Sequence, residues 1–445
     1  LHLYLDESTP LLESLLVDGH LEFDENVPGL KELNAKRIMI RRSEDGASAT
    51  CVLNPQDNKE YCRNFLGAIT AGTPESRFGS NATVVPAPVA RIRLHGDFDD
   101  EPLRLASEYD LGPKVLANFG KLALHGSHRP IVWAKLAETA TAESSSILVE
   151  GVVNWRAGDK LVLTPSSDDF REWEVVTVAA AASVEGGRSR LQLTDPLQRT
   201  YWGELTLVDC DPADVAPTPQ TCTVVDGRIE VGLLSHNVEI VSQPDTKGMD
   251  FGCHVYTGRF VRPDVSYHGF TQLDNVHVHG CGQKEGTRSA LFFQNLGNNP
   301  HPDRLSYVRG SSFVSSFLAA LEIQGSSGIN VHHNVFFGSF RSTVRVYAVN
   351  NIFSQNLALF TQARPSTAAK QVDILATYEI FGANDFVGNV AGGCEGTNTE
   401  PGHGYLGFSD ACEVSPNSLR VRDNVVHSSH MGFLIHYEWA QACTQ

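Results

Sequence analysis

The feature of this sequence that most constrains its fold is an Asn-apolar step repeated at a fixed spacing. Asn334-Val335 and Asn356-Leu357 lie 22 positions apart, and Ser312-Phe313 lies 22 positions before the first of them. Such a period accommodates three short strands and three turns in each coil of a solenoid. An asparagine that recurs at one turn can satisfy backbone groups that would otherwise be buried unpaired. The spacing therefore predicts an all-β fold, a right-handed parallel β-helix solenoid.

Further copies of the step extend the repeat in both directions. Asn389-Val390 and Asn424-Val425 follow with longer loops between them, and Asn275-Val276 is an earlier copy. We expect residues 229–445 to form parallel β-helix repeats. Asn334 and Asn356 should then occupy equivalent turns, about 4.8 Å apart, which is the spacing of strands in a sheet.

The amino-terminal half is also rich in strand patterns. Residues 12–24 read as strand, turn and strand around Asp18-Gly19, and the tripeptide Leu-His-Gly occurs at 94–96 and again at 124–126. Residues 147–205 alternate between apolar and polar positions. Residues 42–90 show few periodic apolar positions, which indicates a loop insertion.

Four segments together resemble one known family. They read FGKLALHG at 119–126, VNWRAGDKLVL at 153–163, EVGLLSHNVEI at 230–240 and YVRGSSF at 307–313. This combination is similar to the Gly-rich G8 domain joined to parallel β-helix repeats, as in fibrocystin-like receptors and the related cell-surface hyaluronidases. The resemblance implies a G8-like β-rich domain over 1–228, with the loop insertion near 42–90. It also implies that this module is continuous with the solenoid of 229–445.

The resemblance also shows where a hyaluronidase-type site would lie. Relatives that degrade hyaluronan carry two histidines in a segment that follows a Gly-Gln pair, and here that pair is followed by Arg288. The two histidine positions are occupied by Phe292 and Gln294, and Tyr201 takes the place of a third histidine. Phenylalanine and glutamine do not exchange protons, so neither can act as a general acid or base. We therefore assign no catalytic residues.

The leading hypothesis is a non-catalytic structural or adhesion segment of a large fibrocystin-like ectodomain. The family resemblance, rather than composition, implies a cell-surface or ciliary location. Glycans and other extracellular proteins are candidate ligands. The alternative is a polysaccharide-degrading enzyme of the hyaluronidase type, with its site on a β-helix face.

Charge and local patterns restrict the ligands. The formal net charge of −17 argues against nucleic acid, which needs a basic face. His277 and His279 share one face of a strand and are candidate ligand contacts, as are Arg288, Arg341 and Arg345 if they form a basic stripe. We assign no metal site and no cofactor, although the acidic residues of 97–101 leave Ca²⁺ open.

Cysteine usage indicates an oxidising compartment. Eight of the nine cysteines fall into sequence-local couples without any CxxC pair, so we expect disulfides that pin loops. The couples are Cys51 with Cys62, Cys210 with Cys222, Cys253 with Cys281, and Cys394 with Cys412. Cys443 is left over, and Asn81 begins a glycosylation sequon.

The two ends of the sequence predict neighbours. No apolar run reaches the roughly 20 residues of a membrane span. The chain opens within a strand pattern, and its last residues lack a polar cap. We therefore expect a segment of a larger secreted protein, covered by neighbouring domains or chains at one end at least, with Cys443 bonded there.

Overall fold

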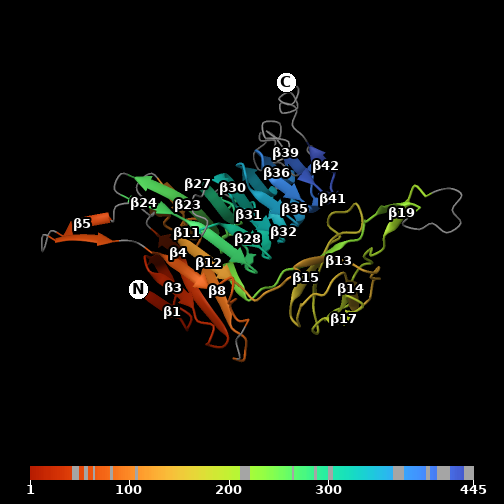
Figure 1. Ribbon diagram of the computed structural model, residues 1–445, viewed down its shortest axis with the longest axis horizontal. Coiled ribbons are helices and arrows are strands. Elements are labelled where there is room, and N and C mark those ends of the chain that lie inside the picture. Colours follow the sequence, from red (N-terminus) through yellow and green to blue (C-terminus); the bar gives the residue numbers. More distant parts are fainter. Residues whose placement is uncertain are drawn as a thin grey trace, which may run out of the picture.

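The computed structural model describes most of the chain in a single parallel β-helix with an inserted module (Figure 1). The described residues are 1–42, 50–54, 59–63, 66–80, 84–105, 109–210, 221–262, 265–284, 288–298, 304–363, 375–396, 401–407 and 421–434. Every regular element among them is a β-strand. The predicted all-β parallel β-helix is confirmed by three ladders of parallel strands, named here ladders A, B and C.

Each ladder takes one strand from each coil. Ladder A contains β1 (His2–Leu5), β3 (His20–Phe23), β7 (Ala68–Ala71), β12 (Lys121–His125), β25 (Phe270–Asp274), β28 (Tyr307–Arg309), β31 (Asn330–His332), β34 (Ile352–Ser354), β37 (Asp385–Val387) and β40 (Val421–Arg422). Ladder B contains β2 (Leu12–Val17), the second half of β4 (Leu30–Arg41), β11 (Val115–Phe119), β23 (His254–Arg262), β27 (Leu291–Asn298), β30 (Leu321–Ser327), β33 (Ser342–Tyr347), β36 (Leu375–Phe381), β39 (Gly402–Gly407) and β42 (Met431–Leu434). Ladder C contains the first half of β4, then β8 (Val89–Leu94), β22 (Val238–Ser242), β26 (His277–His279), β29 (Ser312–Ser316), β32 (Val335–Phe340), β35 (Leu357–Gln362), β38 (Val390–Cys394) and β41 (Val425–His427).

The ladders enclose a continuous core because alternate side chains of each strand point inward. Aromatic rings stack from coil to coil inside it. The ring centroids of Phe353 and Phe386 are 4.5 Å apart, and those of Tyr378 and Tyr405 are 4.9 Å apart. All four side chains are fully buried. Each coil therefore buries its apolar face against the next, as the repeat requires.

A buried asparagine ladder lines the corner between ladders A and C. Asn334, Asn356, Asn389 and Asn424 follow one another in successive coils. The side-chain oxygen of each of the last three accepts from the backbone N–H and the side-chain amide of the asparagine before it. The residue before each has a positive φ, such as 53° at Gln355. This turn exposes the inward backbone groups that the asparagines satisfy. The predicted equivalence of Asn334 and Asn356 is confirmed.

Two other predicted copies of the repeat were misplaced by one residue. Val335 pairs with Ser312, so Ser311 and not Ser312 is the equivalent of Asn334. Ser312 in turn pairs with His277, which puts Val276 at the asparagine position. Asn275 instead occupies the preceding position, with φ of 57°. Asparagine tolerates this left-handed conformation better than most residues, which explains why it also occurs there.

The strands of the amino-terminal half are coils of the same β-helix. β12 lies between β7 and β25 in ladder A, so the ladder runs without a break from β1 to β40. The predicted loop insertion, 42–90, contains β7 and the hairpin of β5 (Thr50–Asn54) and β6 (Lys59–Arg63). A second hairpin, β9 (Leu103–Leu105) with β10 (Tyr109–Gly112), follows β8. The proposed domain division after residue 228 stays a prediction.

A compact antiparallel unit is inserted at the asparagine corner, between β12 and β22. We call residues 130–235 the inserted module. Its strands are β13 (Trp133–Lys135), β14 (Ser146–Val149), β15 (Lys160–Leu163), β16 (Glu174–Thr177), β17 (Ser183–Glu185), β18 (Arg188–Gln192), β19 (Thr206–Val208), β20 (Thr223–Val225) and β21 (Glu230–Leu233). Trp155 is 1% exposed at the centre of its separate apolar core.

The module packs against ladder C (Figure 1). The indole N–H of Trp133 donates to the carbonyl of Gln355 over 2.7 Å. The ring of Trp173 lies 5.0 Å from that of Phe337, centroid to centroid. Trp155 therefore serves packing within the module, and Trp133 and Trp173 serve packing at its junction with the β-helix.

Two of the predicted disulfides are present. Cys210 is bonded to Cys222, and Cys253 to Cys281. Cys51 and Cys62 are backbone partners in the β5–β6 hairpin, but their side chains lie outside the described part of the structure. Cys412, Cys443 and Asn81 lie outside the described residues as well.

The predicted disulfide between Cys394 and Cys412 requires a correction. Cys394 is a free thiol, fully buried on β38 in ladder C. Its strand lies within the coil wall, and its backbone N–H is bonded to the hydroxyl of Ser429 in the next coil. Burial raises the pKa of the Cys394 thiol to about 12. Sequence proximity suggested a loop cysteine, whereas the residue belongs to the core.

Candidate functional site

A cavity with polar walls lies between ladder C and the inserted module. We call it the junction groove; it has a volume of about 570 Å³. One wall is formed by β8, β22 and β26 of the β-helix, and the other by β15 and β16 of the module. Its polar lining includes Arg91, Arg93, Lys160, His236, Glu239, His277 and His279. Apolar side chains such as Val175 and Phe337 complete it.

Arg91 and Arg93 both lie on β8 and face the same side of it, because they are two residues apart. Arg91 pairs with Glu239 on the neighbouring strand, with Nε 2.5 Å from Oε2, and also with Glu32 at 3.1 Å. Arg93 reaches the same Glu32 carboxylate at 3.0 Å. These guanidiniums hold the pKa of Glu32 below its usual value although burial opposes the shift. The arginine wall is therefore rigid and largely neutralised.

The predicted histidine pair forms part of this groove. His277 and His279 stack with ring centroids 5.6 Å apart, and His277 Nδ1 lies 2.9 Å from the hydroxyl of Ser312. Burial, the ring of His279 and the cation of Lys160 lower the pKa of His277 to about 3. Both rings are consequently neutral at physiological pH, because burial also lowers the pKa of His279. They can exchange hydrogen bonds with a ligand without carrying charge.

Two further groups give the groove unused polar capacity. Neither ring nitrogen of His236 has a hydrogen-bond partner among the described residues, although the side chain is only 8% exposed. The ammonium of Lys160 likewise has no ion-pair partner in the described part of the chain. Buried polar groups normally find partners, so an unsatisfied imidazole in a cavity wall marks a place for water or a ligand. Sequence reasoning missed both residues: Lys160 belongs to the module, and His236 lies in the connection from the module to β22.

The three arginines predicted as ligand contacts lie outside the groove, and Arg91 and Arg93 of the groove were not predicted. Arg288 precedes β27 and contacts Asp110 at 3.5 Å, near the β9–β10 hairpin. Arg345 lies on β33 of ladder B between Glu322 and Glu379, at 3.5 and 3.2 Å. Those carboxylates outweigh the effect of burial and raise the pKa of Arg345.

Arg341 lies at the turn between β32 and β33, with φ of 72°. Arg309, on β28 of ladder A, is ion-paired to Asp274. The arginines are thus distributed over different ladders instead of forming one stripe. None of them lines the junction groove.

The three positions compared with the hyaluronidase histidines do not converge. Phe292 and Gln294 lie on β27 of ladder B, where the hydroxyl of Tyr256 donates to Gln294 Oε1 over 3.0 Å. Tyr201 lies in the core of the inserted module and is 1% exposed. Its hydroxyl contacts Glu174 at 3.1 Å, and burial together with that carboxylate raises the pKa of the phenol.

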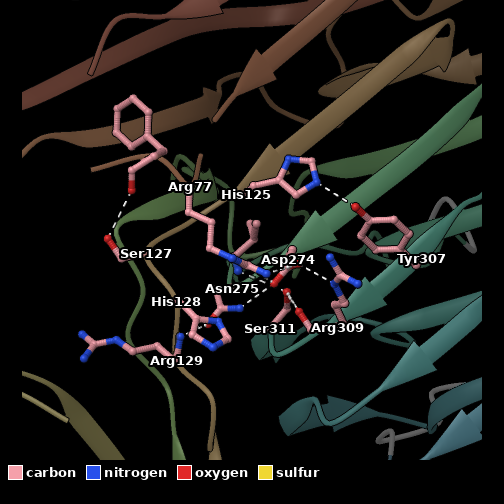
Figure 2. A network of polar contacts seen from close by, with 12 residues as sticks. Arg77, His125, Ser127, His128, Arg129, Asp274, Asn275, Tyr307, Arg309 and Ser311 are labelled. Carbon is pink, nitrogen blue, oxygen red and sulfur yellow. Dashed lines mark hydrogen bonds and ion pairs between the residues drawn. The ribbon is translucent and has the colours of Figure 1, made fainter. Parts of the chain in front are cut away.

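A separate polar network lies where the chain leaves the β-helix for the module (Figure 2). The Asp274 carboxylate, 1% exposed, accepts two hydrogen bonds from Arg77, at 2.6 and 2.9 Å, and is also paired with Arg309. His125 Nε2 lies 2.7 Å from the hydroxyl of Tyr307 beside it. Asp274 is therefore a structural anchor on ladder A, apart from the histidine pair that follows it in sequence.

The acidic loop considered for Ca²⁺ faces cations of the protein itself. Asp100 contacts Lys36 at 3.3 Å, and Glu101 contacts Arg37 at 3.4 Å. Asp99 pairs with Lys247. These carboxylates are committed to ion pairs.

The comparisons with known proteins agree with this architecture. Residues 2–137 match the G8 domain family. The chain contains a G8 domain. In the structure the matched residues comprise the first coils of the β-helix, from β1 to β12, and end two residues after β13, the first strand of the inserted module. The extent of the G8-like domain over residues 1–228 stays a prediction.

The relatives of this G8 protein are much longer chains. It is 25% identical to mouse fibrocystin-L over 99% of its own length, and covers 10% of that protein. It is 26% identical to fibrocystin of the dog over 74% of its length, covering 7% of that protein. A G8 domain-containing protein of Dictyostelium discoideum is 24% identical over 74% of the chain and 21% of that protein. The chain thus spans about a tenth of the length of the first of these relatives.

Among solved structures, the tailspike protein gp49 of Pseudomonas phage LKA1 aligns with 98% of this chain and 66% of its own. The TM-score is 0.20 at 11% sequence identity, so the β-helix assignment here rests on the strand ladders. Within the described residues, no helix is both long and apolar enough to cross a membrane.

Proposed function

We propose that this chain is a non-catalytic, ligand-displaying segment of a larger extracellular protein. Three observations support the proposal. The chain is similar over nearly its whole length to about a tenth of fibrocystin-L. Two disulfides pin its loops, as is typical of an oxidising compartment. A continuous β-helix core gives a rigid surface on which a ligand site can be built.

The junction groove is the proposed ligand site, and its unpaired Lys160 is the observation that carries this assignment. Lys160 comes from the module and faces a wall that contains His277 and His279 from the β-helix. The arginines of that wall are neutralised by Glu32 and Glu239, so an incoming anion is attracted chiefly by the free ammonium. Neutral imidazoles can exchange hydrogen bonds with hydroxyl groups. A short acidic saccharide combines a carboxylate with hydroxyls and fits this set of partners.

We assign no catalytic activity to the chain because of the residue types at three positions. Phe292, Gln294 and Tyr201 occupy the positions where the resemblance to hyaluronidases predicts histidines. These three side chains are dispersed over ladder B and the core of the module. A polysaccharide-degrading enzyme remains the alternative function, and it would require acid and base groups other than these.

Ligand binding can be tested with a charge reversal at Lys160. We expect hyaluronan octasaccharide to bind the purified chain in calorimetric titrations, and a neutral cello-oligosaccharide to bind more weakly. Lys160→Glu should reduce the affinity at least tenfold, because an attraction becomes a repulsion. Arg188→Glu is a matched control, since Arg188 lies on the same module outside the groove. Equal loss in both variants, or no binding to wild type, would refute the groove as an acidic-saccharide site.

The same proposal places the segment outside the cell, at the cell surface or on the cilium, with neighbouring domains or other extracellular proteins as partners. Asn81 would then be available for glycosylation. Secretion from animal cells followed by enzymatic deglycosylation tests this part. A mass decrease of one glycan that is absent in Asn81→Gln supports it, and a secreted protein without that decrease removes the glycoprotein assignment.

A further inference from the structure

A cluster of side chains on the first coils of ladder A has the composition of a transition-metal site. His2 on β1 and His20 on β3 are partners in register on adjacent parallel strands. Glu22 lies two residues after His20 and therefore projects from the same face of β3. The alternate residues Leu5 and Phe23 are buried in the core, so the cluster faces outward. Two strands thus deliver three potential ligands to one surface patch.

The distances within the cluster suit a single small cation. One potential ligand atom from each of the three residues lies within 4.8 Å of those of the other two. His2 Nε2 is 2.8 Å from Glu22 Oε2, and the rings of His2 and His20 stack with centroids 4.1 Å apart. A metal ion with bonds of about 2.0–2.2 Å needs only small rotations of these side chains. His2 and Glu22 are 43% and 30% exposed, so an ion can reach them from solvent.

A neighbouring hydroxyl can orient one of the ligands. His20 Nε2 lies 2.7 Å from the hydroxyl oxygen of Thr70 on β7. When Nε2–H donates to that oxygen, the lone pair on Nδ1 remains for a cation. Metal-binding histidines characteristically donate their second ring N–H to such a partner. Lys121 is the cation in register with His20 across ladder A, with Ala68 of β7 between them. The two residues are therefore two strand spacings apart, about 9.6 Å.

We propose that His2, His20 and Glu22 bind one zinc-class divalent cation that ties β1 to β3. Two imidazoles and one carboxylate favour Zn²⁺ and its first-row neighbours, whereas Ca²⁺ and Mg²⁺ prefer oxygen-only sites. Three protein ligands leave a fourth tetrahedral position for water or for a group of a partner. The site is independent of the junction groove, because none of its residues lines that groove. It strengthens the contact of ladder A's edge strand with the rest of the β-helix.

Titration of Zn²⁺ into the chelator-treated chain tests the proposal. We expect one equivalent to bind to wild type, and this binding to be lost in His20→Ala and in Glu22→Gln. Thr70→Val should weaken it about 10- to 100-fold through loss of the orienting hydrogen bond. His128→Ala is the matched control, since His128 is an exposed histidine outside the cluster, and it should bind as wild type does. Circular dichroism of each variant establishes that the fold is retained.

Two further measurements keep the outcome unambiguous. A chelate formed by His2 with a free terminal amine does not use His20, so binding that survives His20→Ala contradicts the proposal. Expressing the chain with additional residues before Leu1 removes that chelate altogether. Co²⁺ should give the intense visible absorption of a tetrahedral site in wild type and lose it in Glu22→Gln. Absence of Zn²⁺ binding to the folded wild-type chain would overturn the inference.

Discussion

The side-chain oxygen of Asn356 accepts hydrogen bonds from both the backbone N–H and the side-chain amide of Asn334, at 3.1 and 2.9 Å. The two residues are both fully buried and lie in successive coils. Asn356→Ala leaves these two donors buried without a partner. Because each orphaned buried group costs about 1–3 kcal/mol, we expect the free energy of unfolding to fall by about 3 kcal/mol.

Denaturant unfolding measures this loss. Asn330→Ala is a suitable control, because Asn330 is exposed on the same coil as Asn334 and its replacement should change stability by less than about 0.5 kcal/mol. Equal effects of the two substitutions would contradict the role of the asparagine ladder.

The buried carboxylate of Asp274 should make stability depend on acid pH. Burial alone would raise its pKa, but the guanidiniums of Arg77 and Arg309 outweigh burial and lower it. A lowered folded-state pKa contributes stability above the unfolded value of about 3.9, and this contribution is lost as the pH falls through the folded pKa. Asp274→Asn should therefore cost about 1–3 kcal/mol at pH 7, because it removes the carboxylate that pairs with the partly exposed Arg77 and Arg309. The free energies of unfolding of wild type and variant, measured from pH 7 to pH 3, should become more similar as the pH falls. A difference that does not change with pH would show that the ion pairs of Asp274 are not its cause.

Packing of the inserted module on ladder C depends on Trp173. Its ring contacts Phe337 and Phe360, with centroid distances of 5.0 and 5.2 Å. Trp173→Ala should weaken docking by about 1.5–3 kcal/mol, since the side chain is partly buried. Hydrogen exchange of β32 and β35 should then accelerate, while the module's own core stays protected. Trp202→Ala, at an exposed tryptophan of the same module, should leave these rates unchanged.

Cys394 should behave as an inert thiol in the native protein. Its thiol is fully buried and its pKa is raised to about 12, so almost no thiolate exists at pH 8. Alkylation with iodoacetamide should label Cys394 only after unfolding in denaturant without a reductant. Recovery of a peptide in which Cys394 is disulfide-bonded would contradict the free thiol.

The fold was largely predictable because the period of the repeat carries a physical requirement. Buried turn groups at Asn334 and Asn356 need the same partner in each coil, and this need is visible in the sequence. At the preceding coil the equivalent position is occupied by Ser311 instead of asparagine. Because the residue type differs there, the sequence placed that copy of the repeat one residue too late, at Ser312. The disulfide of Cys210 with Cys222 was similarly evident from local spacing.

The candidate site was only half predictable. His277 and His279 lie two apart on one strand, and that spacing identified them. Lys160 reaches the groove only because the module, inserted at the asparagine corner, packs back on ladder C, and His236 lies where the module joins β22. No sequence period reports such a long-range contact. His2 and His20 were missed for the same reason, because their register across two strands became visible only in the structure.

The most direct test of the central claim is the chain length of hyaluronan after incubation with the purified protein. We expect the length distribution, measured by size-exclusion chromatography with light scattering, to remain unchanged with and without added Ca²⁺ or Zn²⁺. The reason is that Phe292, Gln294 and Tyr201 occupy the positions where the resemblance to hyaluronidases predicts histidines, and each lost acid or base group forfeits about 10²- to 10⁴-fold in rate. A saturable activity that shortens hyaluronan and copurifies with the protein would contradict the non-catalytic account.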